Sequence, residues 1–293
     1  IPVYAGIWTG KDYQLPERVR LMGLVIIQAR VSSERLPGKV LLPILGKPVL
    51  SHVIKRAEAA GIGKVILAIP DKAEDDPLEK FAQENSILYY RGSEKDVLDR
   101  YYRAALLHSP DYVVRITSDC PCLDSAVTKN SVEFFKEKKA DYVSSASREI
   151  FYHGTDTEVF TFQALKEAAE RAEKDYEREH VTPYIRENSK FIRFTYGDGL
   201  KADSIVKSIR ATLDTKEDYI VIKAIFDLLG DNFSHDDVLS LFRRYPWLSE
   251  INGGVVQKAA YHSPEDELRE AVRLLRLQEL KRAADYLAKM FPL

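Results

Sequence analysis

Residues 24–39 read LVIIQARVSSERLPGK and join a short apolar run to a polar loop. The run over 24–29 shows no alternation of apolar and polar residues, which is typical of a central parallel strand that is covered on both faces. The loop over 30–39 is punctuated by Pro37 and Gly38. This stretch predicts a buried strand that ends directly in a polar loop.

The same pattern continues to residue 144, because short apolar runs alternate with segments of helical spacing. This alternation predicts an α/β fold with a mostly parallel sheet and helices on both faces. In such sheets ligands bind beyond the carboxyl ends of the strands, so we expect loops 30–39 and 117–121 to share one crevice. The expected strands are 24–29, 64–69, 87–90, 111–116 and a start at 141–144, and the expected helices are 47–60, 75–85, 94–108 and 124–138.

After residue 150 the pattern changes. Residues 150–200 are expected to form a protruding arm, an element that often makes dimer contacts, and the tail after Pro264 is expected to be one long amphipathic helix. That helix would dock on this domain or on a partner subunit, so a homodimer is expected. The elements expected in this part are strands at 155–162, 190–196 and 205–213, helical structure over 163–188 with a break near Pro183, and helices at 218–229 and 235–244.

The composition restricts the class of protein. A chain of 293 residues suits one large domain with appendages, which we expect to be a main domain over 22–254 and a helical tail over 255–293. Residues 1–21 are interpreted as an extension or an expression-vector remnant, and they lack the pattern of a signal peptide. The net charge of -2 provides no basic field for nucleic acid. No apolar run approaches the roughly 20 residues that span a bilayer, so no membrane contact is expected.

The two cysteines favour a reducing cytoplasm. Cys120 and Cys122 are one residue apart, which is poor placement for a disulfide, and they are too few for a zinc site. Cys120 is interpreted as a small buried residue, because no general base lies beside it in the sequence. The histidines without metal-ligand spacing are His153, His180, His235 and His262.

The polar loop has the composition of a phosphate site. Arg30, Arg35 and Lys39 lie within ten residues of one another, with Ser32 and Ser33 between them. Cations, hydroxyls and exposed backbone N–H groups together bind phosphate well. The spacing G-x-x-x-x-G-K-[ST] of a P-loop is absent. The residue types alone fit a phosphate-binding loop and a solvated charged loop equally well.

Two aspartates are candidate metal ligands. Asp119 follows the strand 111–116, and a carboxylate there suits Mg²⁺, although it also suits the cap of the next helix or a turn. Asp214 follows the expected strand 205–213 and is placed to be a second carboxylate ligand, although it also suits the N-cap of the next helix. Thr215 and Asp218 are explained as the N-cap and the acidic first turn of the following helix.

The sequence resembles the cytidylyltransferase family that includes the CMP-acylneuraminate and CMP-KDO synthetases. The resemblance is strongest to the branch named for spore coat polysaccharide biosynthesis protein F. The matching stretches run in order from about residue 24 to 252, and together they are specific, although each alone is modest. They are IIQARVSSERLPGKVL, RGSEKDVLDRYYRAA, VVRITSDCPCLD, DTEVFTFQAL, EREHVTPYIREN and RATLDTKEDY.

The resemblance implies a nucleotide-diphospho-sugar transferase fold and the transfer of CMP from CTP, with Mg²⁺, to a sugar acid or a similar acceptor. It implies metal ligation by Asp119 and Asp214, and catalysis by these two carboxylates with Arg30 and Lys39. The implied nucleotide-binding residues are Gln28, Ala29, Arg30, Ser32, Ser33, Arg35, Lys39, Arg91, Ser93, Asp99 and Asp119. The implied acceptor-binding residues are Asp156, Glu158, Arg178 and His180, within stretches that also hold Glu179.

The sequence leaves several points open. The loop reads R-V-S-S-E-R where relatives have a glycine, which would limit how closely the backbone approaches phosphate. His180 also suits helix packing or an interface. Another nucleotide is possible on this fold, but the G-G-x-G-x-R pattern that is common in other branches is absent. A nucleotidylyltransferase with a non-sugar acceptor and a non-catalytic nucleotide-binding scaffold are also compatible with these residues.

Overall fold

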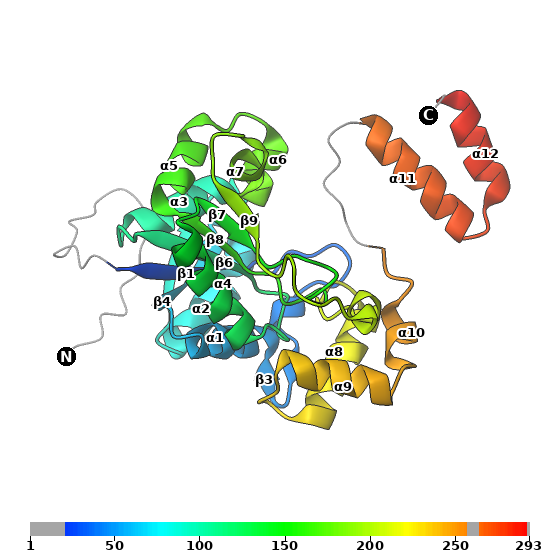
Figure 1. Ribbon diagram of the computed structural model, residues 1–293, viewed down its shortest axis with the longest axis horizontal. Helices are drawn as coiled ribbons and strands as arrows, with labels where there is room; N and C mark the ends of the chain where they lie inside the picture. The colour runs from blue at the N-terminus through cyan, green and yellow to red at the C-terminus, as the bar shows by residue number, and fades with distance from the viewer. Residues whose placement is uncertain (1–20, 257–263, 292–293) are drawn as a thin grey trace. The chain divides into compact units, whose positions relative to one another are not determined.

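The central sheet of this computed structural model has seven strands in the described residues, 21–256 and 264–291. Their order is β5-β4-β1-β6-β8-β7-β9 (Figure 1). Only β8 runs antiparallel to its neighbours, so the predicted mostly parallel sheet is confirmed. The strands are β1 (Gly23–Gln28), β4 (Lys64–Pro70), β5 (Leu88–Gly92), β6 (Tyr112–Thr117), β7 (Tyr142–Ser144), β8 (Glu158–Thr161) and β9 (Arg193–Thr195).

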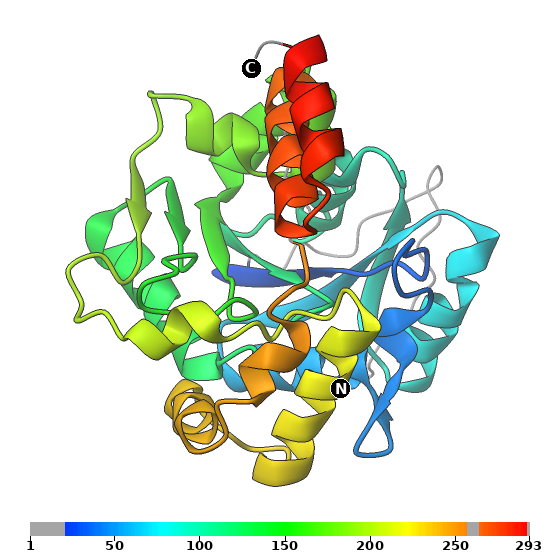
Figure 2. The same cartoon turned by 90° about the vertical axis from the view of Figure 1, so that its right-hand side faces the viewer.

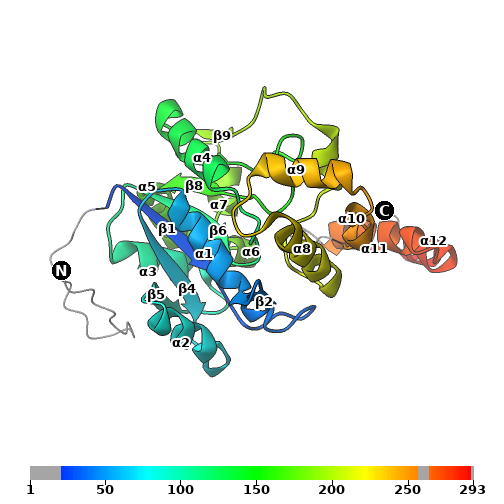
Figure 3. The same cartoon turned by 90° about the horizontal axis from the view of Figure 1, so that it is seen from below.

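Helices cover both faces of the sheet, as predicted. Alternate residues of β1 point to opposite faces. Val25 and Ile27 belong to one hydrophobic cluster, and Leu24 and Ile26 belong to another. Figure 3 shows α1 and α4 together over one face. The helices of the first cluster are α1 (Val49–Ala59), α2 (Asp76–Glu84) and α4 (Ser125–Lys138), and α3 (Val97–Leu106), α5 (Phe162–Arg171) and α7 (Pro183–Glu187) contribute to the other.

A third hydrophobic cluster lies under the loops that follow the strands. It joins Leu36 of the polar loop and Cys122 to α8 (Lys216–Leu229), α9 (His235–Arg244) and α10 (Leu248–Asn252). The hairpin of β2 (Pro43–Ile44) and β3 (Lys47–Pro48) borders this cluster, and Tyr219 of α8 donates a hydrogen bond to the carbonyl of Pro43 at 2.5 Å. Figure 2 shows the yellow helix α8 beside this blue hairpin. This packing ties both polar loops to one helical layer.

The strand predicted over 205–213 is wrong. Its first half forms the 3-10 helix η3 (Ser204–Ser208), because the Asp203 side chain accepts a hydrogen bond from the N–H of Ile205. Its second half is extended but joins no strand of the sheet, since it pairs only through a bridge from Arg210 to His153. The alternating apolar residues that suggested a strand, Ile209, Ala211 and Leu213, are buried in the third cluster instead.

The arm expected over 150–200 is corrected in its central part. β8 pairs with β6 on one side and with β7 on the other, so it lies within the sheet. The section over 163–188, which was expected to be helical with one break, contains three helices: α5, α6 (Asp175–His180) and α7. α5 packs in the cluster on one face of the sheet, and both α5 and α6 contact α3. The dimer contact stays a prediction.

The tail is two helices rather than one long helix. The chain divides into two units after Val255, and the second unit holds α11 (Pro264–Leu277) and α12 (Lys281–Met290). Glu279 adopts a left-handed φ of 58°, and the N–H of Leu280 bonds the carbonyl of Leu275 at 2.8 Å. This helix-ending motif usually carries glycine, so the sequence did not reveal it.

Two further expectations concern the chain ends and membranes. Apart from Leu21, the segment 1–21 lies outside the described residues. Across 21–256 and 264–291, no helix has both the length and the apolar character needed to cross a bilayer.

Candidate active site

Two loops leave the sheet at the same edge. Gln28 at the end of β1 is in register with Thr117 at the end of β6. The loop after β1 is closed by a hydrogen bond from the N–H of Gly38 to the carbonyl of Val31 at 3.0 Å. Gly38 has a φ of 69°, a conformation that glycine adopts at little cost. The turn at Gly38 leads directly into Lys39.

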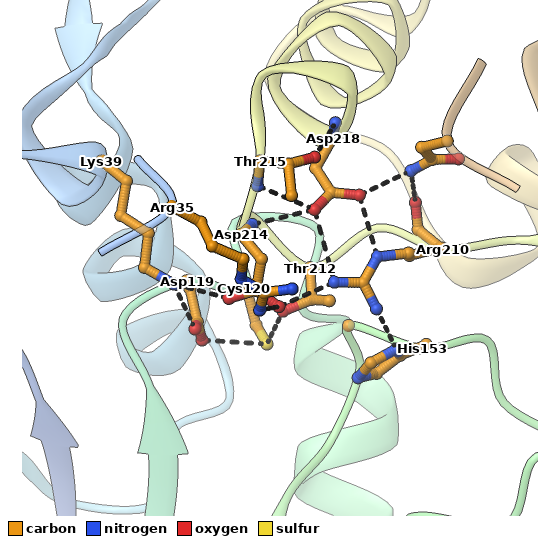
Figure 4. Close-up of polar contacts among 12 residues, drawn as sticks. Arg35, Lys39, Asp119, Cys120, His153, Arg210, Thr212, Asp214, Thr215 and Asp218 are labelled. Atoms are coloured by element: carbon orange, nitrogen blue, oxygen red, sulfur yellow. Dashed lines mark hydrogen bonds and ion pairs between the residues drawn. The ribbon is translucent and has the colours of Figure 1, made fainter. Parts of the chain in front are cut away.

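Lys39 joins the two predicted carboxylates (Figure 4). Its Nζ donates to Oδ2 of Asp119 at 2.8 Å and to Oδ1 of Asp214 at 2.9 Å. The N–H of Leu213 also bonds the carbonyl of Asp119 at 2.7 Å, which holds the two aspartates together through the backbone. Residues from three distant parts of the sequence therefore form one polar cluster.

The cluster keeps both carboxylates ionised. Burial alone would raise the pKa of Asp119, but the charge and hydrogen bond of Lys39 lower it to about 2. The pKa of Asp214 is likewise lowered, because Lys39 outweighs the effect of burial. Burial alone would lower the pKa of Lys39, and the two carboxylates reverse that, so the net shift is upward. At neutral pH Lys39 is therefore positively charged, and Asp119 and Asp214 are negatively charged.

The capping roles considered for these aspartates belong to other residues. Asp124, and not Asp119, caps α4, because its side chain accepts hydrogen bonds from the N–H groups of Ala126 and Val127. Thr215 is the N-cap of α8 as expected, and Asp218 completes the capping box. Asp214 has neither capping role and points its carboxylate into the cluster.

Cys120 lies beside the cluster as a buried thiol. Burial raises its pKa well above the usual range, and Asp119 raises it further. The thiol contacts Thr117 and Thr212 at 3.3 and 3.8 Å. These contacts fit the expected small buried residue.

The sequence did not single out Arg210 or His153 for a role in the site. Arg210 Nη2 bonds Oδ2 of Asp214 at 2.7 Å, and its Nε bonds Oδ1 of Asp218 at 2.9 Å. Arg210 Nη1 lies 3.2 Å from Nδ1 of His153. Because a guanidinium only donates, Nδ1 accepts this hydrogen bond and the proton of neutral His153 stands on Nε2. Arg210 falls within the stretch RATLDTKED, which is the signal that was available.

Arg30 and Ser32 of the polar loop lie near the connection from β5 to α3, whereas Arg35 lies at Asp214. Ser32 Oγ donates to Oε1 of Glu94 at 3.4 Å, and the charge of Arg30 lowers the pKa of Glu94, after the larger effect of Lys72. Arg35 Nη2 is 3.0 Å from Oδ2 of Asp214. Buried Asp75, which no sequence pattern indicated, supports the loop by accepting a hydrogen bond from the N–H of Val31 at 2.7 Å.

Other nucleotide-site candidates have separate structural contacts. Gln28 Oε1 accepts a hydrogen bond from Nε of Arg115 at 3.2 Å. Arg91 is bound by Asp76 and Glu79 of α2. The remaining candidates lie as follows: Ala29 is buried beside β4, Ser33 is half-buried in the polar loop, Ser93 accepts a hydrogen bond from the N–H of Asp96, and Asp99 pairs with Arg103.

Two of the acceptor-site candidates are structural in their contacts. Glu158 is buried, and it pairs with Arg115 and accepts hydrogen bonds from Tyr142 and Thr182 at 2.5 and 2.7 Å. Arg178 binds Asp96 at the start of α3. Neither side chain joins the Lys39 cluster.

Asp156 and His180 have different surroundings. Asp156 pairs with Arg148 at 2.6 Å, and its charge acts on His153. It therefore lies on the His153 side of the cluster. His180 is half-buried, and burial lowers its pKa. Its partial burial fits a packing histidine.

The low pKa of Asp119 predicts an acid-sensitive contribution to stability. Its folded-state pKa of about 2 lies below the ordinary 3.8, so the stabilisation is complete above pH 4 and is lost as the pH falls through 2. Urea unfolding measures the free energy of unfolding of the wild type and of Asp119→Asn. The advantage of the wild type over the variant should be about 2 kcal/mol smaller at pH 2 than at pH 6. The exposed Asp227→Asn serves as control, and a gap that stays constant between pH 6 and pH 2 contradicts the assignment.

Comparisons with known proteins agree with this geometry. Residues 24–244 match the cytidylyltransferase family. An uncharacterised protein of Methanocaldococcus jannaschii is 36% identical, over 80% of this chain and 96% of its own length. The spore coat polysaccharide biosynthesis protein SpsF of Bacillus subtilis is 31% identical, over 76% and 95%.

A solved structure gives the same result. The structure of a cytidylyltransferase from Leptospira borgpetersenii superposes with a TM-score of 0.73 at 31% identity, and the match covers 83% of this chain and all of the other. The family match includes both polar loops and the segment that carries Asp214. With its parallel sheet and the polar loops at one edge, the chain belongs to the cytidylyltransferase family and is a nucleotidyltransferase.

Proposed function

We propose that this enzyme transfers CMP from CTP to a sugar acid or a sugar-like acceptor and releases pyrophosphate, in the synthesis of a surface polysaccharide or another glycan. The observation that carries the proposal is the convergence of Asp119 and Asp214 on Lys39, at the end of the loop that follows β1. Carboxylates for a metal and cations for phosphates are the groups that nucleotidyl transfer requires. The cytidylyltransferase family supports CTP as the nucleotide.

The two carboxylates fit Mg²⁺. Both are held ionised, and both contact the same Nζ atom within 2.9 Å, so they are close enough to share one cation. Mg²⁺ usually takes one or two carboxylates together with phosphate oxygens and water. In the described parts of the chain, no group of three or more His, Cys, Asp or Glu is arranged around a metal position. A site of two carboxylates completed by CTP agrees with that.

The loop cations would neutralise the triphosphate. The hydroxyl oxygen of the acceptor attacks the α-phosphorus and gives its proton to solvent, the bond from that phosphorus to the bridging oxygen breaks, and pyrophosphate leaves. Arg30, Arg35 and Lys39 would bind the β- and γ-phosphates and so stabilise the leaving group. Mg²⁺ held by Asp119 and Asp214 would supply stabilisation of the charge on the non-bridging oxygens. No covalent enzyme intermediate is required, so positioning and electrostatics supply the catalysis.

We place the acceptor beside His153 and Asp156. His153 presents an N–H at Nε2, because Nδ1 is taken by Arg210. Asp156 is paired with Arg148, and this ion pair combines an acceptor and a donor of hydrogen bonds. Such a set suits the hydroxyl and carboxylate groups of a sugar acid.

The test is pyrophosphate release with Mg²⁺, measured with CTP, UTP, GTP and ATP against a panel of eight-carbon and nine-carbon sugar acids. We expect release with CTP and one acid of the panel. The exposed variant Lys223→Met controls for non-specific loss, and Asp156→Asn should raise the KM for that acid while the KM for CTP stays the same.

Different outcomes of this assay would point to different functions. Release with a different nucleotide would replace CTP in the proposal. Release with CTP only when a non-sugar acceptor is supplied would overturn the sugar acid. A thermal shift with CTP but no release with any acceptor would favour a nucleotide-binding scaffold.

A further inference from the structure

One guanidinium connects the Asp214 carboxylate to the interior of the protein (Figure 4). Arg210 binds Oδ2 of Asp214 at 2.7 Å, and it binds both oxygens of Asp218 at 2.9 and 3.3 Å. The Asp218 side chain is completely buried. The Arg210 side chain is 11% exposed, so the pair forms part of the protein interior.

The same pair holds Asp214 at both of its ends. Oδ2 of Asp218 accepts hydrogen bonds from the backbone N–H groups of Asp214 and Thr215, each at 3.0 Å. Arg210 holds the carboxylate end. The Asp214 side chain is therefore fixed at its backbone by Asp218 and at its carboxylate by Arg210.

Asn252 of α10 holds this pair from the other side. Its Nδ2 lies 2.9 Å from the carbonyl of Arg210 and 2.9 Å from Oδ1 of Asp218. Three elements meet here: the extended segment with Arg210, the start of α8 and the end of α10. Buried hydrogen-bond networks of this kind restrict a side chain to one orientation.

The other two cations on Asp214 have a different origin. Lys39 and Arg35 belong to the polar loop, and the Arg35 side chain is 35% exposed. In the proposed reaction these two bind phosphates, and that moves their charge away from Asp214. Arg210 does not belong to the polar loop, and it donates hydrogen bonds to Asp214, Asp218 and His153.

The geometry points to Arg210 as a positioning residue that holds the Asp214 carboxylate in place for a divalent cation while Lys39 and Arg35 serve the nucleotide. This inference rests on the proposed metal role of Asp214. A guanidinium suits the task because its planar fork contacts two carboxylates at once. A lysine at position 210 would keep the charge and lose the fork.

The test measures Mn²⁺ binding to the full chain at a fixed CTP concentration. The EPR signal of free Mn²⁺ monitors the binding, and the Mn²⁺ bound by CTP without protein is subtracted. Arg210→Lys should weaken Mn²⁺ binding about tenfold, as the loss of a residue that orients a metal ligand does. Asn252→Ala should weaken it in the same direction by a smaller factor. Arg243→Lys, which alters an exposed ion pair with Asp203, is the matched control and should bind as the wild type does.

Thermal unfolding of each variant separates positioning from a structural role. Weaker Mn²⁺ binding by Arg210→Lys well below its unfolding temperature supports the inference. A lower Tm with wild-type Mn²⁺ affinity overturns it and leaves Arg210 a structural residue. A wild type that binds no Mn²⁺ in the presence of CTP overturns the proposed metal role itself, and the inference with it.

Discussion

Replacing Lys39 by Met is expected to lower CTP-dependent pyrophosphate release and, at the same time, to tighten divalent-metal binding in the absence of nucleotide. The rate should fall about 10²- to 10³-fold, the usual effect of removing one charge-stabilising donor. Metal affinity should rise at least about tenfold, because Lys39 now places a positive charge within 2.9 Å of both carboxylates. Methionine is close to lysine in shape, so the change removes mainly the charge.

The opposite signs make this prediction specific. If Lys39 were only a structural residue, its loss would disturb both properties in the same direction. Mn²⁺ titration without CTP and a pyrophosphate-release assay on the same preparation measure the two effects. Lys55→Met, which removes a lysine paired with Asp231, is the matched control. Weaker metal binding together with a slower reaction would contradict the position of Lys39 between the carboxylates as the cause.

The two opposite effects of Lys39 also suggest how the enzyme without ligands differs from the enzyme with bound nucleotide and metal. In the free enzyme the positive charge between Asp119 and Asp214 is that of Lys39. In the proposed reaction a triphosphate would be a stronger partner for the ammonium, and the carboxylates would then become available to a divalent ion. Metal and nucleotide would then favour each other's binding, which is a reciprocal effect.

The part of the site that follows the strands of the main sheet was predictable from the sequence. A buried run that ends in a polar loop identifies the carboxyl end of a parallel strand, and this places Lys39 and Asp119 at one edge. β1 and β6 are neighbours in register, so this expectation is confirmed. The pattern carries the information because burial on both faces requires a continuous apolar run.

Asp214 lies beside Asp119 as expected, but a different structural feature positions it. The segment before it is not a strand of the sheet, so a strand end does not position it. A backbone hydrogen bond from Leu213 to Asp119 and packing in the third cluster do so. Local periodicity cannot distinguish these long-range contacts from a strand ladder. The expected strand end suggested the proposed role of Asp214 on a premise that was wrong, and the resemblance to a family supported that role independently.

Arg210 and Asn252 could not be predicted from spacing. Their importance depends on a buried carboxylate, Asp218, which in sequence has the ordinary appearance of an acidic residue in the first turn of a helix. The turn between α11 and α12 was missed for a similar reason, since Glu279 takes a conformation that usually requires glycine. In each case a tertiary contact or a strained residue overrides the local pattern.

Asp119→Asn and Asp214→Asn are each expected to lower pyrophosphate release by about 10³-fold, and the double variant should be little worse than either single variant. Residues that act as a unit have strongly non-additive effects. Here both carboxylates would share one cation, so neutralising either one removes most of the stabilisation of the transition-state charge. Each asparagine keeps the size of the side chain and removes only the negative charge.

The measurement is pyrophosphate release over a range of Mg²⁺ concentrations for the two single variants, the double variant and Asp227→Asn as control. CTP-induced thermal shifts without Mg²⁺ establish that each variant still binds nucleotide through the polar loop. Effects that multiply in the double variant would mean that the two carboxylates act independently, with only one of them at the metal. Full activity in both single variants would exclude the metal site, and the arrangement around Lys39 would then be a structural ion-pair cluster.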